Sequence, residues 1–110
     1  MRLYLAMLPI EPAILKRLQN EGVIWLTTVS PDGQPQASVV WFLWQDDHCL
    51  IYSKADAPKL AAIRQHPKVA LNLNSSAQGG EVVTFDATAQ IVAEHPTADK
   101  VPQYVEKYRD

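Results

Sequence analysis

The sequence is poor in the residues and runs that mark several large classes of protein. It has a single cysteine, Cys49, so no intramolecular disulfide can form, which is typical of a reducing compartment. It has no basic block, and its net charge of −2 argues against a nucleic-acid partner. The apolar run at residues 3–8 is too short to span a bilayer, and no A-x-A cleavage pattern follows it. These absences predict a cytoplasmic protein that binds neither nucleic acid nor membrane.

The sequence also lacks the motifs of the common catalytic centres. His48, His66 and His95 stand at no metal-ligand spacing, which predicts that there is no metal site. There is no G-x-S-x-G nucleophile elbow and no Walker loop, and Gly79-Gly80 is too short for a dinucleotide fingerprint. No catalytic side chain is therefore predicted, and a bound cofactor becomes the simplest source of chemistry.

What the sequence does contain is the pattern of one small, mainly β domain. Its 110 residues are 47% hydrophobic and 20% charged, as in an ordinary globular chain, and we expect a single domain over residues 1–110. Residues 1–10 are expected to form a loosely held arm. Periodicity and turn residues predict helices at 12–20, 56–65 and 99–109, and strands at 23–29, 35–44, 48–53, 69–73 and 81–93.

This order of elements predicts an α+β, mainly antiparallel β-barrel with short flanking helices. The turn Ser30-Pro31-Asp32-Gly33 joins the first two strands into a hairpin. No closing strand follows the last predicted helix. We therefore expect an edge of the barrel to be covered by a further C-terminal segment or by a partner.

The stretch from Pro35 to Lys59 organises the rest, because it combines two strands, a turn and the start of a helix. Side chains alternate faces along its first strand. One face is predicted to build the core, so that Val39→Asp would unfold the domain; it consists of Ala37, Val39, Trp41 and Leu43. The other face begins polar and ends aromatic, which suits a surface that holds a ligand; it consists of Gln36, Ser38, Val40, Phe42 and Trp44.

The helix that follows has an unusual charge pattern at its beginning. Asp56 is a good N-cap, and Pro58 fits the first turn. Lys54 and Lys59 flank this N-terminus, where cations oppose the helix dipole and an anion is favoured. A phosphate bound between the two lysines explains the pattern, and a pair of solvated surface lysines explains it equally well.

The run VVWFLW at residues 39–44 is apolar on both faces, although the interior of a small barrel can take only one of them. Phe42 and Trp44 on the outside would form a patch that soluble monomers avoid. The run therefore predicts a homodimer in which this patch pairs with its copy.

At these residues the sequence resembles the pyridoxamine 5'-phosphate oxidase-like split-barrel proteins, and within them the small branch that uses the deazaflavin coenzyme F420. The matching segments cover nearly everything after residue 22; they are WLTTVSPDGQPQASVVWF, YSKADAPKLAAIRQHPKVAL, GGEVV and VPQYVEKYRD. The resemblance implies an FMN-binding type of split barrel, a homodimer with the cofactor between two barrels, and a small-molecule substrate.

The resemblance also implies which residues contact the cofactor. The strand Pro35–Phe42 would lie along the cofactor ring, and Lys59, seven residues after Tyr52 and eight before Pro67, would reach the phosphate. A loop of the partner chain, with Gln78 and Gly79, would close over the ring. The implied contact residues are Gln36, Ser38, Val40, Trp41, Phe42, Tyr52, Ser53, Lys54, Lys59, Gln78 and Gly79.

The sequence departs from the family pattern at two places that matter for the choice of cofactor. Other members have an arginine at the position of Ser38, and Ser-Arg at the position of Ala57-Pro58. Those arginines grip the phosphate of FMN in the true oxidases, so their replacement favours coenzyme F420. The implied function is hydride transfer between F420 and a small organic substrate. The alternatives are an FMN-dependent enzyme, a non-enzymatic flavin-binding module, and a structural dimer that has lost its ligand.

Overall fold

The computed structural model of the chain describes residues 2–6, 12–45, 48–53, 57–76, 78–80, 82–92 and 101–108. Within these ranges seven strands form one antiparallel sheet in the order β3-β2-β6-β7-β1-β5-β4. The strands are β1 (Arg2–Ala6), β2 (Val23–Val29), β3 (Pro35–Trp41), β4 (Leu43–Gln45), β5 (His48–Tyr52), β6 (Lys68–Asn72) and β7 (Thr84–Val92). The helices are α1 (Pro12–Asn20), α2 (Pro58–Gln65) and α3 (Pro102–Lys107).

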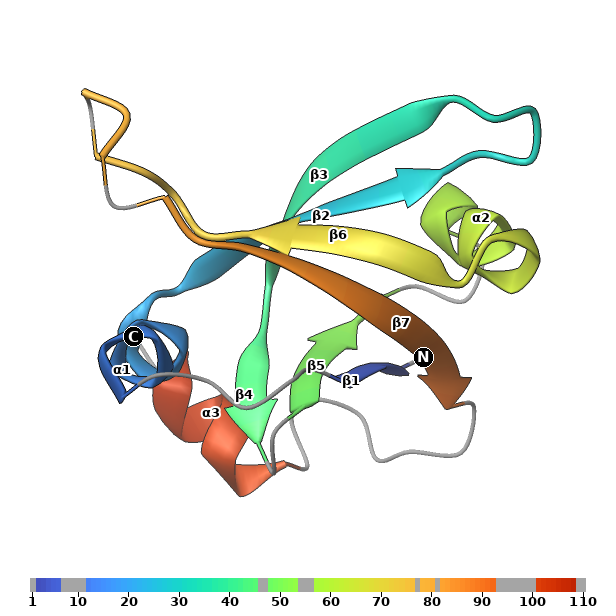
Figure 1. The fold of residues 1–110 in the computed structure, drawn as a ribbon. Helices are drawn as coiled ribbons and strands as arrows, with labels where there is room; N and C mark the ends of the chain where they lie inside the picture. The colour runs from blue at the N-terminus through green and yellow to red at the C-terminus, as the bar shows by residue number, and fades with distance from the viewer. Residues whose placement is uncertain are drawn as a thin grey trace.

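The sheet curls into a split barrel, because its two outermost strands are consecutive in the chain (Figure 1). β3 ends at Trp41 and β4 begins at Leu43, so one segment forms both edges of the sheet. The predicted antiparallel barrel with short flanking helices is confirmed.

The β2–β3 hairpin forms as the turn residues predict. The Gly33 amide donates to the Ser30 carbonyl oxygen at 2.8 Å, and Gly33 has a φ of 94°, which glycine adopts without strain. Side chains of β2 alternate between buried and half-buried, and Ile24 and Leu26 are fully buried. β2 therefore has one face in the barrel interior and one face outside.

The predicted faces of the last strand are confirmed as well. Ala87 and Ala89 are buried in the main core, whereas Asp86 and Thr88 are exposed. The strand begins at Thr84, later than the predicted 81, and its predicted end at 93 lies outside the described residues.

The expectation of a loose arm at residues 1–10 is wrong for the part that the structure describes. Arg2–Ala6 forms β1, which pairs with β5 on one side and with β7 on the other. A position between two strands satisfies backbone groups on both edges of the segment. This strand lies well inside the sheet.

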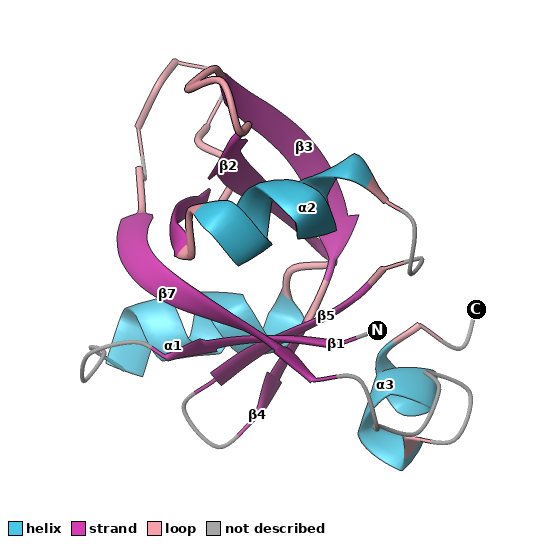
Figure 2. Ribbon diagram, turned by 90° about the vertical axis from the view of Figure 1, so that its right-hand side faces the viewer, coloured by secondary structure: helices cyan, strands magenta, loops and turns pink. Residues whose placement is uncertain are grey.

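α1 and α2 lie toward opposite ends of the barrel, and α3 lies beside β4 (Figure 2). Leu18 of α1 and Leu60 and Ile63 of α2 are buried in the main core. α3 packs over a smaller second cluster made of Leu43, Leu50 and Val101, with Tyr52 and Tyr104 at its border. Within the described ranges, no helix is both long and apolar enough to cross a bilayer.

Candidate functional site: the split of the barrel

The split lies where the segment of residues 35–45 changes its partner strand. β3 pairs with β2 up to Trp41↔Val23, and β4 pairs with β5 from Leu43↔Leu50 onwards. β3 and β5 approach each other across this point. Among the described residues, the outer edge of β3 has no partner strand, and the edge of β5 that faces β4 has none beyond Leu50, where β5 stays paired with β1 on its other edge. These two edges bound the split.

The two faces of β3 are the reverse of the prediction. Val39 and Trp41, which were expected in the core, are 50% and 56% exposed. Val40 packs against the main core, and Phe42 is fully buried in it. The reason is register: Ser38 and Val40 stand opposite Leu26 and Ile24, and residues that pair directly share a face. The interior of the barrel therefore takes the face that was expected to hold the ligand.

The first turn of α2 retains the features of a phosphate site. Its N-cap is Ala57, not the predicted Asp56, and no side chain caps it. Pro58 has no N–H, and the Leu60 amide bonds the Ala57 carbonyl oxygen at 3.0 Å. Lys59 is half-buried in this turn, and the turn contains no acidic residue. The combination favours an anion.

The residues at the end of β5 are only partly brought to the split. Tyr52 is half-buried and turns outward, where its ring meets Tyr104 edge-on at 5.0 Å between centroids. Ser53 is half-buried directly after the strand. Lys54 lies outside the described residues, so its predicted role stays a prediction.

Gln78 and Gly79 are not brought to the split of their own chain. They lie in a turn that projects from the barrel beyond β6 and β7, far from α2 (Figure 1). Ser76 closes this turn by accepting from the Gly79 amide at 2.9 Å, and Gly79 has a φ of 81°. Gln78 is exposed. Their predicted contact with a ring on another chain stays a prediction.

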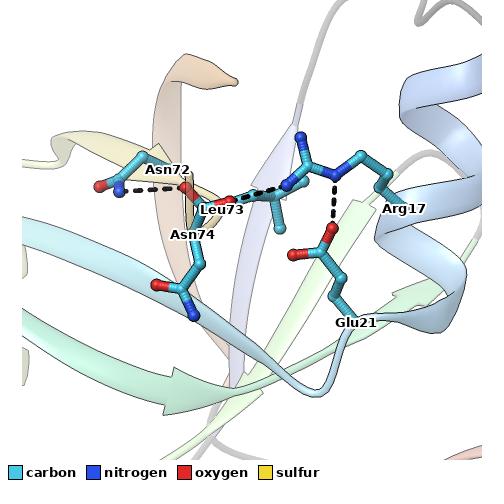
Figure 3. A network of polar contacts seen from close by, with 5 residues as sticks. All are labelled: Arg17, Glu21, Asn72, Leu73 and Asn74. Atoms are coloured by element: carbon cyan, nitrogen blue, oxygen red, sulfur yellow. Dashed lines mark hydrogen bonds and ion pairs between the residues drawn. The ribbon is translucent and has the colours of Figure 1, made fainter. Parts of the chain in front are cut away.

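The projecting turn is anchored where it leaves the sheet (Figure 3). Arg17 of α1 pairs with Glu21 and donates through Nη2 to the Asn74 carbonyl oxygen at 2.8 Å. Trp25 donates through Nε1 to the Asn74 side-chain oxygen, also at 2.8 Å. Two elements thus hold the base of the turn through one residue.

The sequence did not predict a set of hydrogen bonds at Phe42, the residue between β3 and β4. Lys107 at the end of α3 and Tyr108 directly after it make these bonds, and we call the two residues the clasp. The Phe42 amide donates to the Tyr108 hydroxyl at 2.8 Å, and this hydroxyl lies 2.7 Å from the carbonyl oxygens of both Gly22 and Phe42. Lys107 donates to the Phe42 carbonyl oxygen at 2.7 Å, with Nζ 3.7 Å from the centre of the Phe42 ring. The backbone groups that lose their sheet partner at the break are satisfied in this way.

Burial sets the protonation of the groups around the clasp. It raises the pKa of Tyr108 and of Cys49 to about 12, and it lowers the pKa of Lys107 to about 8. The apolar stripe of the terminal helix was predicted. The bonds made by the Tyr108 hydroxyl and the Lys107 amine could not be predicted, because their partners are backbone atoms far away in the sequence.

Two open hollows lie outside the split. One, of about 540 Å³, lies over β2, β6 and β7; its lining includes Thr27, Val29, Lys68, Ala70, Asp86 and Thr88. The other, of about 570 Å³, lies between α1 and α3; it is lined by Gln19, Leu43, Pro102, Gln103, Glu106 and Lys107. Within the described part of the chain, no three His, Cys, Asp or Glu residues are grouped as metal ligands would be.

Comparison with known proteins supports the fold. The family model described as pyridoxamine 5'-phosphate oxidase matches residues 10–110. The structure is similar to that of the conserved hypothetical protein Rv2991 from Mycobacterium tuberculosis, with a TM-score of 0.76 and 25% identity over 93% of this chain. That match spans 66% of the Mycobacterium protein, so this chain corresponds to only part of its length.

Two further solved structures share the fold. HutZ, the heme storage protein from Vibrio cholerae, has a TM-score of 0.71 and 20% identity, over 92% of this chain and 77% of that protein. A protein described as an F420 reductase has a TM-score of 0.73 and 22% identity, over 93% of this chain and 79% of that protein. No curated protein matches this chain.

Proposed function

Because this chain belongs to the pyridoxamine 5'-phosphate oxidase family, we propose that it is an oxidoreductase that binds coenzyme F420, or alternatively FMN, along the split of its barrel. The observation that supports this most strongly is the first turn of α2, where a half-buried lysine stands beside a helix N-terminus with no capping side chain. A phosphate there would meet a cation and the positive end of the helix dipole.

The residues of the split fit the phosphate end of such a cofactor. Lys59 would hold the phosphate, and the outer edge of β3 would run beside the ring. The bound cofactor would supply hydride chemistry, while the protein would orient it and exclude water. The reversal of the β3 faces limits direct contact by Phe42, which is fully buried. Gln36 is exposed and Ser38 is half-buried, so both remain candidates for contact.

The preference for F420 over FMN rests on Ser38 and Pro58, which replace arginines of the FMN-binding pattern. The F420 reductase with the same fold is consistent with this preference. The heme storage protein with the same fold supports the alternative of a non-enzymatic binding module. An assay that follows the absorbance of F420 in the presence of candidate substrates distinguishes the two. An enzyme would change the absorbance as it transfers hydride, and a binding module would not.

The test is a binding titration of F420 and of FMN against the wild type and Lys59→Ala. We expect Lys59→Ala to weaken binding by about 1.5–3 kcal/mol, the value of a charge-assisted hydrogen bond. Lys16→Ala is the matched control, because Lys16 is an exposed lysine on α1. Equal affinities for all three proteins would show that Lys59 is not the anchor, and no binding of either cofactor would overturn the proposal.

The second part of the proposal is a homodimer with a composite site. Val39 and Trp41 on the outer face of β3, together with Val82 at the base of the projecting turn, are between 50% and 64% exposed. A second copy would cover the outer face, and its turn with Gln78 and Gly79 would close over the ring. We expect sedimentation at micromolar concentration to give a dimer, and a monomer both with and without cofactor would rule out the composite site.

A further inference from the structure

The outer face of β2, β6 and β7 carries two opposite charges in one shallow hollow of about 540 Å³. Lys68 on β6 and Asp86 on β7 both line this hollow, and both side chains are exposed. Within the described part of the chain, no ion pair joins them to each other or to a third residue. The hollow therefore offers a cation and an anion to a complementary surface.

The register of the two strands places these charges at the corners of a small rectangle. Lys68 stands opposite Thr88, and Ala70 stands opposite Asp86. The two charges therefore lie on one diagonal, and two small side chains lie on the other. All four side chains point to the outside, because the residues between them on each strand are buried. Neighbouring strands lie about 4.8 Å apart and alternate residues roughly 6.8 Å apart, so the two charges can reach different partners.

This arrangement is complementary to itself. A two-fold axis that runs along the face through Ala70 and Thr88 places each of these small residues opposite its own copy. The same axis brings Lys68 near Asp86 of the partner subunit, and the pair occurs twice. Packed sheets lie about 10 Å apart, a gap that an extended lysine and an aspartate can span together.

We propose that the outer face of β2, β6 and β7 binds a second copy of this chain through two symmetric ion pairs between Lys68 and Asp86 of the partner subunit. The interface rests on the homodimer proposed above and specifies its two-fold axis. The face continues to β3, since Ala37 stands opposite Thr27 and Thr27 stands opposite Ala70. The ion pairs would fix the orientation of the two copies, while the exposed apolar side chains of β3 would add buried area.

The first experiment reverses each charge and measures the dimer dissociation constant by sedimentation equilibrium. Lys68→Glu and Asp86→Lys should each raise the dissociation constant about ten-fold or more, because like charges then face each other. The variant that combines both reversals should return to the wild-type value, since both pairs form again with their charges exchanged. Lys16→Glu is the matched control, because Lys16 is an exposed lysine on α1.

The second experiment tests the position of the axis with a short bismaleimide, which links two thiols. Ala70→Cys should be linked to its own copy, because the axis places the two thiols opposite each other. Gln19→Cys is the control, since Gln19 is exposed on α1 and does not belong to the face, and the native Cys49 is fully buried. We expect Ala70→Cys to be linked about ten-fold faster or more than Gln19→Cys, because the dimer raises the effective concentration of its thiols.

Three results obtained with a dimer would overturn this interface alone. They are an equal response to Lys68→Glu and Lys16→Glu, a combined variant that is no tighter than the single ones, and equal cross-linking of Ala70→Cys and Gln19→Cys. The cofactor proposal would stand after each of them, because the titration of Lys59→Ala tests it separately. A wild-type monomer would overturn the interface together with the composite site.

Discussion

Two apolar faces on the outside of the barrel differ in how the chain covers them. Over β4 and β5, α3 packs on Leu43 and Leu50, and Leu50 is only 1% exposed. Over β3, Val39 is 50% exposed, and Trp41 is 56% exposed although its ring stacks on Tyr108 at 4.5 Å. Tyr108, directly after α3, therefore covers β3 only at its last residue, Trp41, and leaves Val39 exposed. The comparison shows that the chain covers one apolar face by itself and leaves much of the other exposed.

The largest expected effect comes from placing a charge on each face in turn. Leu50→Asp should lower the free energy of unfolding by about 4 kcal/mol, because it buries a carboxylate without a partner. Val39→Asp should change the stability of the monomer by roughly 0.5 kcal/mol or less, since the side chain is half exposed. Urea unfolding of both variants measures the difference.

Val39→Asp carries a second expectation that sharpens the comparison. It should dissociate the proposed dimer, because a carboxylate on the apolar outer face of β3 would be buried in the interface. Loss of folding in Val39→Asp, with Leu50→Asp tolerated, would show that the two faces have been assigned the wrong way round.

An intermediate effect is expected from Tyr108→Phe. The variant keeps the ring that stacks on Trp41 but removes the hydroxyl that bonds the Phe42 amide and the Gly22 carbonyl group. We expect a loss of about 1–3 kcal/mol, since a buried amide loses its partner. Amide hydrogen exchange at Phe42 should speed up more than exchange at Ile24, and equal changes at both would argue against a local clasp.

The smallest expected effect is a pH dependence of the unfolding free energy. It should come from Lys107 at the end of α3, the helix that covers β4 and β5. Burial lowers the pKa of Lys107 to about 8, below its value in the unfolded chain. Between pH 8 and the unfolded pKa, the unfolded state binds more protons, so this lysine makes the stability rise with pH. The pKa of Cys49, which burial raises to about 12, acts in the opposite direction above the ordinary thiol pKa of 9.0. Between pH 7.5 and 9 we therefore expect the unfolding free energy of the wild type to rise relative to that of Lys107→Met, and parallel curves would contradict this.

Local sequence signals predicted the hairpin and the alternating strands. Val23–Val29 forms the strand that its β-branched and aromatic residues predict, and Gly33 forms the expected turn. The alternation along β7 was unambiguous because one of its faces is polar. In such segments the pattern in the sequence and the burial in the fold carry the same information.

The orientation of β3 could not be predicted from its own residues. Because residues 39–44 are apolar on both faces, their pattern fits either assignment, and the register against Ile24 and Leu26 decides between them. The break at Phe42 has no glycine or proline to mark it and results from a change of partner strand. The clasp by Tyr108 was invisible for the same reason, since its partners are distant backbone atoms.

The position of β1 has a consequence for the way the chain folds. Arg2 pairs with Tyr52 and also with Val92, so β1 must find both of its partner strands far away in the sequence. Contacts between such distant residues carry a large loop-closure cost and slow the folding of β proteins. During synthesis β1 would leave the ribosome before β7 and wait for it before both of its edges are paired. We expect the hairpin of β2 and β3 to form early, and the pairing of β1 with β7 to form late.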